Sequence, residues 1–366
     1  MMFKTRWRAS TLCLLAVVTI VVILLLNTLD FPFSQLDKGF RLERDPIPSS
    51  SVSVPVIIPE VEVYTFQEVT SWTRETNICA SIDNQIYHGD FFRVPLESQV
   101  GSLSVFIHNP TKDGLSGKIY KERRWEPNIL NVILLFLRTD DDTNFIDIGA
   151  NIGLHGLQIA KYGRKVLALE ASKHNVQHIC ASTHYGRFHD YVKVVYNAAG
   201  KNHETSNIIL GGWGDLAGNF VNISNTRKQK FKTDGKFAYK DTTVSVPTVT
   251  LDDLLSWQHF EIYKKSFIKM DVEGSEHLVM EGAKRFMQNS NIKGIIMEWK
   301  WHKGQSSAET ILDIMKSCKF QPFDFSNTKI TRKKFFSQDN LTKLFRSLNP
   351  NESSSWPANV LWAPMS

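Results

Sequence analysis

The sequence predicts an α/β protein with a mostly parallel sheet and helices on both faces. Three observations predict it: short apolar segments alternate with amphipathic segments after residue 144, glycines follow the first apolar segment, and acidic residues end several of them. This alternation is typical of parallel sheets, because a connection between parallel strands crosses one face of the sheet, usually as a helix.

The expected elements follow one another from residue 144 onward. The expected strands are Phe145–Ile148, Lys165–Leu169, Tyr191–Tyr196, Val244–Val249, Phe267–Met270, Ile295–Met297 and Asn359–Trp362. The expected helices are Leu154–Tyr162, Ser172–Ser182, Ser275–Met287 and Ala308–Cys318. Thr250–Asp253 has the pattern of a capping box, which predicts one further helix start. We assign residues 141–366 to this α/β domain.

Residues 61–140 give a mixed pattern. Ser102–Ile107 predicts a strand and Asn128–Arg138 a buried helix, with Trp125 and Glu126 just before it. We interpret this segment as an N-terminal extension that packs on the sheet, not as a separate domain.

An apolar segment lies near the N-terminus. Leu12–Leu26 is interrupted only by Thr19, and three basic residues precede it. A membrane-spanning helix needs about 20 residues, so we place a signal anchor at residues 11–29. The alternative is a cleaved signal peptide, but no small-x-small cleavage site follows. Because positive charge stays in the cytosol, residues 1–10 are expected to be a cytoplasmic tail and the body lumenal.

Residues 30–60 contain five prolines and a run of three serines. This composition predicts a stem that holds the body away from the membrane. Three N-glycosylation sequons, at Asn222, Asn340 and Asn351, fit a lumenal body.

The chain has four cysteines, of which Cys13 falls in the expected anchor. The other three, Cys79, Cys180 and Cys318, allow one disulfide with one free thiol, and the sequence leaves the pairing open. Cys180 falls on the apolar face of an expected helix, where we expect a buried, inert thiol. No Cys or His spacing is typical of a metal site, and we assign no metal ligands.

The chain is basic, with a formal net charge of +6 and an isoelectric point near 9.0. Its basic residues cluster at 118–124, 227–240 and 329–334. We interpret these clusters as solvated surface; the alternative is a surface that attracts anionic glycans or membrane headgroups. Nucleic acid is not an expected partner in a lumenal compartment.

The most informative stretch is Asn144–Gly153, N-F-I-D-I-G-A-N-I-G. A buried strand followed by a glycine turn and a helix is how a parallel sheet holds a nucleoside-like cofactor. A dinucleotide fingerprint would need G-x-G-x-x-G, but Asn151 occupies the second glycine position, which disfavours an oxidoreductase. The pattern D-x-G-x-x-x-G instead resembles the first motif of S-adenosylmethionine (SAM) methyltransferases.

Each part of such a cofactor has a candidate partner. Gly149 and Gly153 let the backbone approach the methionine end without a Cβ in the way. Glu170 lies ~20 residues past the glycine turn, where a carboxylate can accept hydrogen bonds from both ribose hydroxyls. Asn197 ends the third strand of the α/β domain and is a candidate contact of the adenine region.

Acidic residues end four of the expected strands, at Asp147, Glu170, Asp271 and Glu298. Any one of them could cap the helix that follows. In an open α/β sheet, however, these strand ends line the ligand crevice, so the four together predict a binding site.

The second informative stretch is Phe267–Glu276, F-I-K-M-D-V-E-G-S-E, which places Asp271, Glu273 and Glu276 at one strand-to-helix turn. Methyl transfer to an alcohol needs positioning and a base that accepts the hydroxyl proton. Asp271, Glu273 and His155 are the candidates, although His155 could equally be a surface helix residue. The three acids could alternatively bind Mg²⁺, so a divalent metal stays uncertain.

Seven motifs in this order resemble the FkbM family of SAM-dependent methyltransferases: F-I-D-I-G-A-N-I-G, L-A-L-E-A-S, V-Y-N-A-A, V-T-L-D-D-L, I-K-M-D-V-E-G-S-E, I-I-M-E-W and N-V-L-W-A-P. The resemblance implies a Rossmann-like class I methyltransferase fold, with SAM as cofactor. It implies a cofactor site made of Asp147, Gly149, Asn151, Gly153, Glu170 and Asn197, to which we add Ala150 of the same turn. It implies active-site acids at Asp271, Glu273 and Glu298, and His155 is the further catalytic candidate from its position after the glycine turn.

The chain departs from the family pattern at Ala171, where a proline is common, and in a long polar insertion at Gly200–Asp241. An anchor in front of this body also resembles invertebrate Golgi glycan O-methyltransferases. The resemblance therefore implies a type II membrane enzyme of the Golgi, with the endoplasmic reticulum less favoured. It would transfer a methyl group from SAM to a hydroxyl of a glycan or glycoside. A terminal hexose is the preferred acceptor, its 3-hydroxyl first. The alternatives are an O-methyltransferase for a lipid or small-molecule hydroxyl and a non-catalytic lumenal binding module.

Overall fold

The computed structural model describes residues 60–67, 71–80, 91–210, 220–222, 242–327 and 341–365, of which 208–210, 220–222 and 242–243 are described by their backbone only. The expected tail, the expected anchor at 11–29 and all but the last residue of the expected stem lie outside the described residues, as does most of the insertion. None of the helices in the described ranges is long and apolar enough to cross a membrane.

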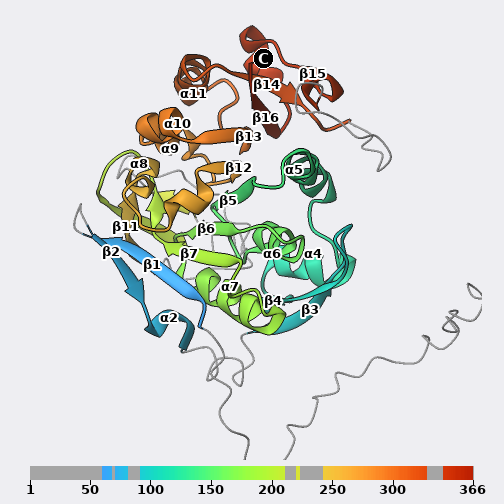
Figure 1. Ribbon diagram of the computed structural model, residues 1–366, viewed down its shortest axis with the longest axis vertical. Coiled ribbons are helices and arrows are strands. Elements are labelled where there is room, and N and C mark those ends of the chain that lie inside the picture. Colours follow the sequence, from blue (N-terminus) through green and yellow to red (C-terminus); the bar gives the residue numbers. More distant parts are fainter. Residues whose placement is uncertain are drawn as a thin grey trace, which may run out of the picture. The chain divides into compact units, whose positions relative to one another are not determined.

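A ten-stranded sheet forms the centre of residues 58–366 (Figure 1). From one edge to the other its strands are β15 (Arg346–Ser347), β14 (Phe320–Asp324), β16 (Asn359–Pro364), β13 (Asn291–Glu298), β12 (Lys265–Met270), β5 (Asn144–Ile148), β6 (Val166–Glu170), β7 (Val192–Tyr196), β1 (Glu62–Gln67) and β2 (Ser71–Glu75). Neighbouring strands from β13 to β1 pair in parallel. The pairs β13–β16, β16–β14, β14–β15 and β1–β2 are antiparallel. The predicted mostly parallel sheet is therefore confirmed.

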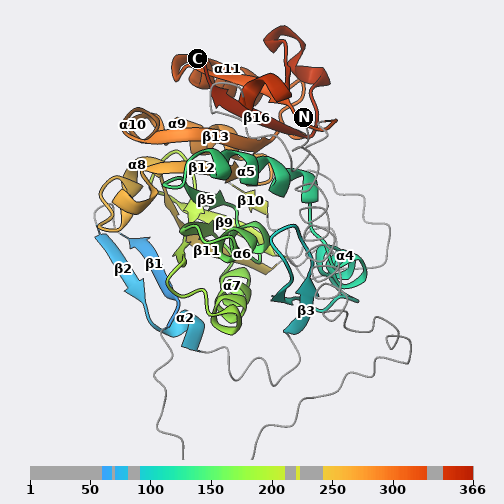
Figure 2. The same ribbon diagram turned by 45° about the vertical axis from the view of Figure 1, so that its right-hand side comes forward.

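Helices cover both faces of this sheet (Figures 1 and 2). One face packs against α5 (Pro127–Thr139), α6 (Leu154–Lys161) and α7 (Lys173–Gly186), and the other against α8 (Leu251–Leu254), α9 (Glu276–Glu281), α10 (Lys284–Asn289) and α11 (Ser306–Ser317). Strand residues alternate between the two cores: Phe145 belongs to the first, whereas Ile146 and Ile148 belong to the second. Successive side chains of a strand point to opposite faces of the sheet, and because helices cover both faces, both sets are buried.

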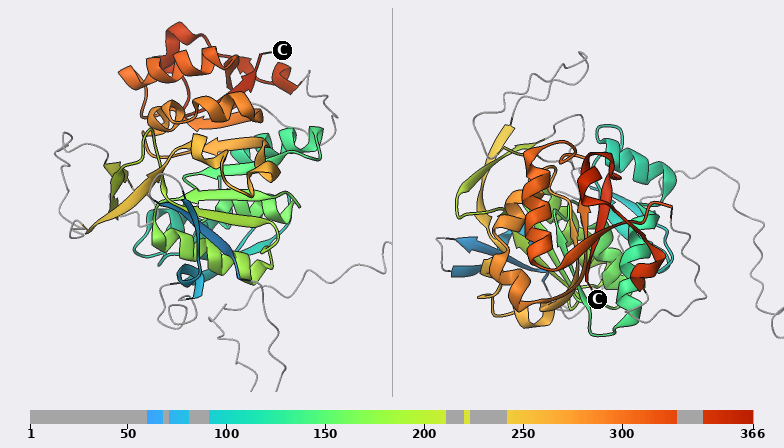
Figure 3. Two further views of the ribbon diagram at one scale, coloured as in Figure 1. Left: turned by 60° about the vertical axis from the view of Figure 1, so that its left-hand side comes forward. Right: turned by 90° about the horizontal axis from the view of Figure 1, so that it is seen from above.

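Two smaller sheets flank the central one. The strands β3 (Phe92–Leu96) and β4 (Leu103–Ile107) form a hairpin that shares a core with α4 (Gly114–Glu122). The strands β8 (Ala198–Ala199), β9 (Thr205–Leu210), β10 (Phe220–Asn222) and β11 (Thr242–Val249) form the other sheet, part of which stands out from the domain (Figure 3). Two segments of the predicted insertion, β9 and β10, thus belong to a sheet.

The single helix expected at Ser275–Met287 is wrong, because the structure breaks it into α9 and α10 at Gly282. The backbone N–H of Asp252 donates to the carbonyl of Gly282 at 3.0 Å, and the Asp252 carboxylate caps α10 by accepting from the N–H of Phe286 at 2.7 Å. A Cβ at Gly282 would lie 2.3 Å from the carbonyl oxygen of Gly200. Tertiary contacts with the α8 region therefore override the helical pattern. The predicted capping box at Thr250 is confirmed.

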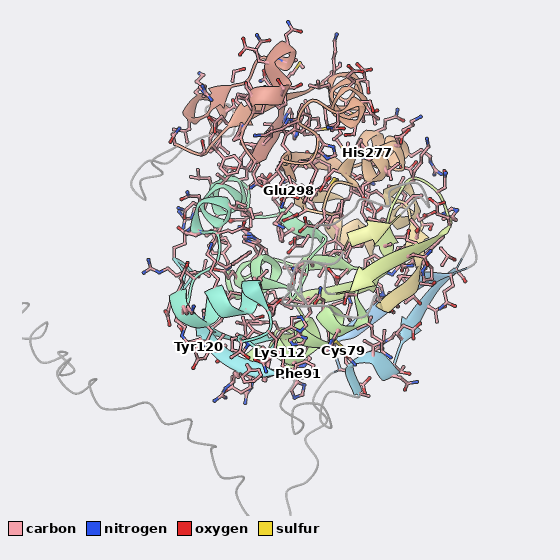
Figure 4. All side chains as sticks on the ribbon, turned by 180° about the vertical axis from the view of Figure 1, so that it is seen from behind. Cys79, Phe91, Lys112, Tyr120, His277 and Glu298 are labelled. Carbon is pink, nitrogen blue, oxygen red and sulfur yellow. A yellow bond between two sulfur atoms is a disulfide. The ribbon has the colours of Figure 1, made fainter. Side chains whose placement is uncertain are left out.

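A disulfide joins Cys79 to Cys180, with 5.7 Å between the Cα atoms, and Cys318 is free. Cys79 belongs to α2 (Asn77–Ala80), which packs on α7 beside the β1–β2 hairpin (Figure 4). The expectation of an inert thiol at Cys180 is wrong. The helix face is apolar as predicted, but it receives α2 and the partner sulfur.

Replacing both Cys79 and Cys180 by Ala should lower the free energy of unfolding by about 2–4 kcal/mol, because the bond closes a long loop. The two cysteines are 101 residues apart in sequence. Denaturant titration checks the change. Cys318→Ser, which breaks no disulfide, is the matched control. Equal midpoints for the two variants would contradict this account.

Candidate active site

The carboxyl ends of the parallel strands open onto a cleft of about 410 Å³. Nine of the eleven predicted site residues line it: Gly149, Ala150, Asn151, His155, Glu170, Asn197, Asp271, Glu273 and Glu298. The two others, Asp147 and Gly153, are not among the lining residues. The structure therefore brings the cofactor and catalytic candidates to one cavity, as their positions at strand ends predicted.

The turn after β5 lies against the end of β12. Gly149 has a φ of 76°, and a Cβ there would lie 1.9 Å from the carbonyl oxygen of Asp271. The N–H of Asp271 donates to the carbonyl of Ile148 at 2.9 Å, which holds the two strand ends together. Only glycine fits this conformation at this separation.

Gly153 serves a packing role. Its φ is 82°, and a Cβ would lie 2.9 Å from the side chain of Ile179 on α7. The glycine therefore allows the start of α6 to approach α7. The structure does not place it on the cleft wall, where we expected it to approach a cofactor.

Glu170 is buried at the end of β6 and is held by three donors. Its oxygens accept from the N–H of Asn151 and the N–H of Ser172, both at 2.8 Å, and from the Asn175 amide at 3.3 Å. Burial raises the pKa of Glu170 to about 7, although these hydrogen bonds oppose the shift. The carboxylate is fixed at the cleft wall, where a ribose would meet it.

Asn197 lines the cleft, but its amide is already engaged. The oxygen accepts from the N–H of Phe66 at 2.8 Å, and the nitrogen donates to the carbonyls of Phe66 and Pro247 at 3.0 and 3.1 Å. The side chain thus joins the end of β7 to β1 and β11. It shapes the expected adenine region more than it offers free polar atoms to it.

A buried lysine lies at the centre of the site. Lys269 is directly opposite Asp147 on the neighbouring strand, and its ammonium group lies 3.1 Å from the Asp271 carboxylate. Burial alone would lower the pKa of Lys269, but the carboxylates of Asp271, Asp147 and Glu126 raise it, so the group is a cation. Burial raises the pKa of Asp147 above its usual value, although the positive charge of Lys269 opposes the shift. Asp147 is buried and does not line the cleft.

A second cluster joins the ends of β12 and β13. The ammonium group of Lys300 lies 2.5 Å from Glu298 and 3.5 Å from Glu273, whose carboxylate also accepts from the Trp301 indole at 3.1 Å. Burial, together with the nearby Asp271 and Glu273, raises the pKa of Glu298. Lys300 opposes this shift, so the lysine is the counter-charge of the cluster.

Carboxylate oxygens of Asp271, Glu276 and Glu298 lie within 4.8 Å of one another, a spacing that a divalent cation could bridge. Glu298 thus takes the place of Glu273 in the acidic group that the sequence suggested. Both oxygens of Glu276 are engaged, by the N–H of Val272 at 2.9 Å and by His302 at 2.7 Å. Because Lys269 and Lys300 already pair with the other two acids, the cluster carries its own positive charge.

The structure adds Glu126, which we had noted only as preceding a helix. Its carboxylate lies 3.0 Å from Nε2 of His155, and both residues line the cleft. Burial alone would raise the pKa of Glu126, but His155 and Lys269 lower it to about 2. The second imidazole nitrogen, Nδ1, is buried without a hydrogen-bond partner among the described residues. His155 is therefore an oriented imidazole rather than a surface helix residue.

Lys118, Trp125, Lys269 and Lys300 also belong to the cleft wall and were not predicted as site residues. Lys118 had been assigned to a solvated basic cluster. Lys269 carried a usable signal, since a lysine inside an apolar strand needs buried counter-charges. No comparable signal marks Trp125.

Comparison with known proteins supports a transferase. Residues 147–322 match the family described as the Methyltransferase FkbM domain. No curated protein sequence matches the chain. Because the matched residues hold all eleven predicted site residues, this region is a methyltransferase domain with SAM as its cofactor, consistent with the FkbM resemblance.

Several solved structures resemble the chain weakly. They include the precorrin-6y C5,15-methyltransferase of Geobacter metallireducens (14% identity, TM-score 0.32, 66% of this chain and 89% of that one). An O-methyltransferase of Bacillus cereus in complex with SAH gives 12% identity and a TM-score of 0.32, over 66% and 82%. The N-terminal domain of human METTL16 gives 14% and 0.31, over 66% and 69%. Because these scores are below 0.5, the assignment rests on the family match and the site.

Gly149→Ala should abolish SAM binding, whereas Gly163→Ala should retain it. Both glycines have a positive φ, 76° and 96°, so both substitutions incur a similar strain of about 1–2 kcal/mol. Only Gly149 has backbone in the way, since nothing lies within 4 Å of a Cβ at Gly163. Calorimetry of SAM binding and thermal unfolding measure the two effects. Equal binding by the two variants would refute the role of this close approach.

Donor binding should weaken as the pH falls, because the pKa of Glu170 is about 7. Above that pH the carboxylate can accept bonds from both ribose hydroxyls; below it, a proton occupies one acceptor. SAM binding near pH 6 should therefore release a proton, seen as a buffer-dependent calorimetric enthalpy. Glu170→Gln should bind roughly tenfold or more weakly and lose the pH dependence. An unchanged wild-type affinity between about pH 6 and 8 would contradict this expectation.

Proposed function

We propose that this protein transfers a methyl group from SAM to a sugar hydroxyl on a glycan in the lumen of the secretory pathway. A terminal hexose is the proposed acceptor, and its 3-hydroxyl is the first candidate. The protein would be a single-pass type II membrane protein of the Golgi. The oriented His155 at the cleft wall, in the same cavity as Glu170, is the observation that carries the proposal.

The cleft is lined by two chemically different sets of residues. Gly149 and Glu170 follow β5 and β6, where a nucleoside donor would bind. Glu126 and His155 lie beside them with the Asp271, Glu273 and Glu298 carboxylates. Gly149 and Glu170 would hold the donor, and the side chains beside them would accept the proton that transfer to a hydroxyl oxygen releases.

The chain's own residues supply positioning and proton transfer. SAM, when bound, would supply a sulfonium methyl group: the acceptor oxygen would attack the methyl carbon in line while the C–S bond breaks and S-adenosylhomocysteine leaves. With His155 donating its Nε2 proton to Glu126, Nδ1 keeps a lone pair and accepts the hydroxyl proton as the new C–O bond forms. Glu126 then stabilises the imidazolium, as the carboxylate does in a catalytic triad. Lys269 pairs with Asp271 at 3.1 Å and holds its carboxylate beside the reacting groups.

Three features support the lumenal compartment. The Cys79–Cys180 disulfide is typical of proteins that fold in an oxidising environment. Asn351 of the third sequon is exposed, so it is accessible to glycosylation. The apolar segment at residues 11–29, with basic residues before it, supplies the proposed anchor.

The test is transfer of labelled methyl from SAM by the purified full-length chain to terminal hexosides, compared with lipid and phenolic hydroxyls. Methylated hexoside should form, with the position read by mass analysis of the product. His155→Asn should lower kcat by roughly 10²-fold or more while SAM still binds. Glu126→Gln should lower kcat less and shift the pH profile, because the imidazole stays in place but loses its counter-charge.

Lys284→Ala provides the matched control, because this lysine is exposed on α10 and does not line the cleft. Transfer only to lipid or phenolic hydroxyls would reject the sugar acceptor but would still support methyltransferase activity. Full activity in His155→Asn would reject His155 as the base.

A further inference from the structure

A second groove, of about 470 Å³, runs along α4 beside the catalytic cleft. The two cavities share Gly114 and Lys118 in their walls, so they adjoin along the first half of α4. Lys112 and Lys121 line the groove farther from the cleft. Figure 4 labels Lys112 and Tyr120 on this side of the domain. An acceptor larger than one sugar would extend from the cleft into this groove.

The groove is built by fixed backbone rather than by loose side chains. The carbonyl of Asn109 accepts from the N–H groups of Lys112 and Asp113, both at 3.0 Å, and the Asn109 side chain accepts from the N–H of Thr111. Gly117 lets α4 approach this loop, since a Cβ there would lie 2.8 Å from the carbonyl oxygen of Pro110. The loop that carries Lys112 is therefore held at a defined distance from the helix.

Three lysines and two acidic residues line the groove, so its net charge is positive. Lys112, Lys118 and Lys121 are exposed, and none forms an ion pair with a described residue. Asp113 is buried and caps α4 by accepting from the N–H of Ser116 at 2.7 Å. The remaining acid of the wall is Glu122, at the far end of the helix.

The lysines are placed to follow an extended ligand. Gly114, Lys118 and Lys121 are spaced four and three residues apart, so they lie on one face of α4. Lys118 and Lys121 are about one turn apart, roughly 5 Å along the axis. At the junction, the Lys118 ammonium lies over the Trp125 ring, 5.5 Å from its centre. This places the cation between the two cavities.

We propose that the groove binds an anionic substituent of the acceptor, on the sugar next to the one that is methylated. The inference rests on the proposed glycan methylation and adds the acceptor's charge. A carboxylate, a sulfate ester and a phosphate share the chemistry that three lysines recognise. Lysines select a negative charge rather than a fixed planar geometry, so the groove should accept more than one of these groups.

The experiment compares glycosides that share a terminal neutral hexose and differ in the second sugar, which is neutral, carboxylated or sulfated. The purified full-length chain should methylate the anionic compounds with a KM roughly five- to tenfold lower than that of the neutral one. The preference should shrink as salt rises from about 50 to 500 mM, because these lysines are exposed. The carboxylated and sulfated arms separate the two sources of charge.

The double variant Lys112→Ala, Lys121→Ala should raise KM for the anionic compounds to that of the neutral one, with kcat and SAM affinity unchanged. Lys118 is left in place because it also lines the cleft. Lys284→Ala with Lys316→Ala, two exposed lysines on α10 and α11, is the matched control and should keep the preference. The inference is overturned if the wild type shows no preference for the anionic compounds, or if the double variant Lys112→Ala, Lys121→Ala keeps the preference. In either case, turnover of the neutral glycoside would still support the proposed function. Failure to methylate every glycoside would overturn both.

Discussion

The buried ammonium group of Lys269 is the interaction on which the cleft depends. It lies opposite Asp147 in the β5–β12 register, bonds to Asp271, and stabilises Glu126 from the segment before α5. Three separate parts of the chain therefore converge on one cation. Removing a single partner from a buried group of charges typically costs about 3–5 kcal/mol, because the remaining charges lose their compensation. The same cation holds these carboxylates close to His155, so packing and chemistry have one origin.

Much of the cleft could be predicted, because it depends on the order of elements alone. Parallel strands deliver their carboxyl ends to one edge, so Asp147, Glu170, Asp271 and Glu298 had to approach one another once each strand was located. Glu126 could not be found in this way. Its backbone is left-handed, with a φ of 34°, and its contact with His155 is set by how α5 packs on the sheet. Nothing in the local sequence encodes that packing.

Asn197 and Gly153 show why the positions at and just after strand ends are ambiguous. Both were expected to contact the cofactor, but the Asn197 amide joins three strands, and Gly153 lets the start of α6 pack closely against Ile179. A strand end is also where the sheet loses its ladder partners, so polar side chains are needed there to satisfy the backbone. The position in the sequence identifies such a residue as important. It does not show whether the residue makes contacts within the fold or contacts a ligand. The break at Gly282 has a similar cause, since the partner of its carbonyl comes from another element.

The Cys79–Cys180 bond has a consequence beyond the strength of the fold. It secures α2, which follows the hairpin whose inner strand supplies Phe66 to the Asn197 amide. Reduction would loosen that hairpin and, through it, the wall of the cleft beside Asn197. Protein made in a reducing bacterial cytoplasm would then fold but bind SAM with lower affinity. Choice of expression host thus bears directly on whether this enzyme looks active.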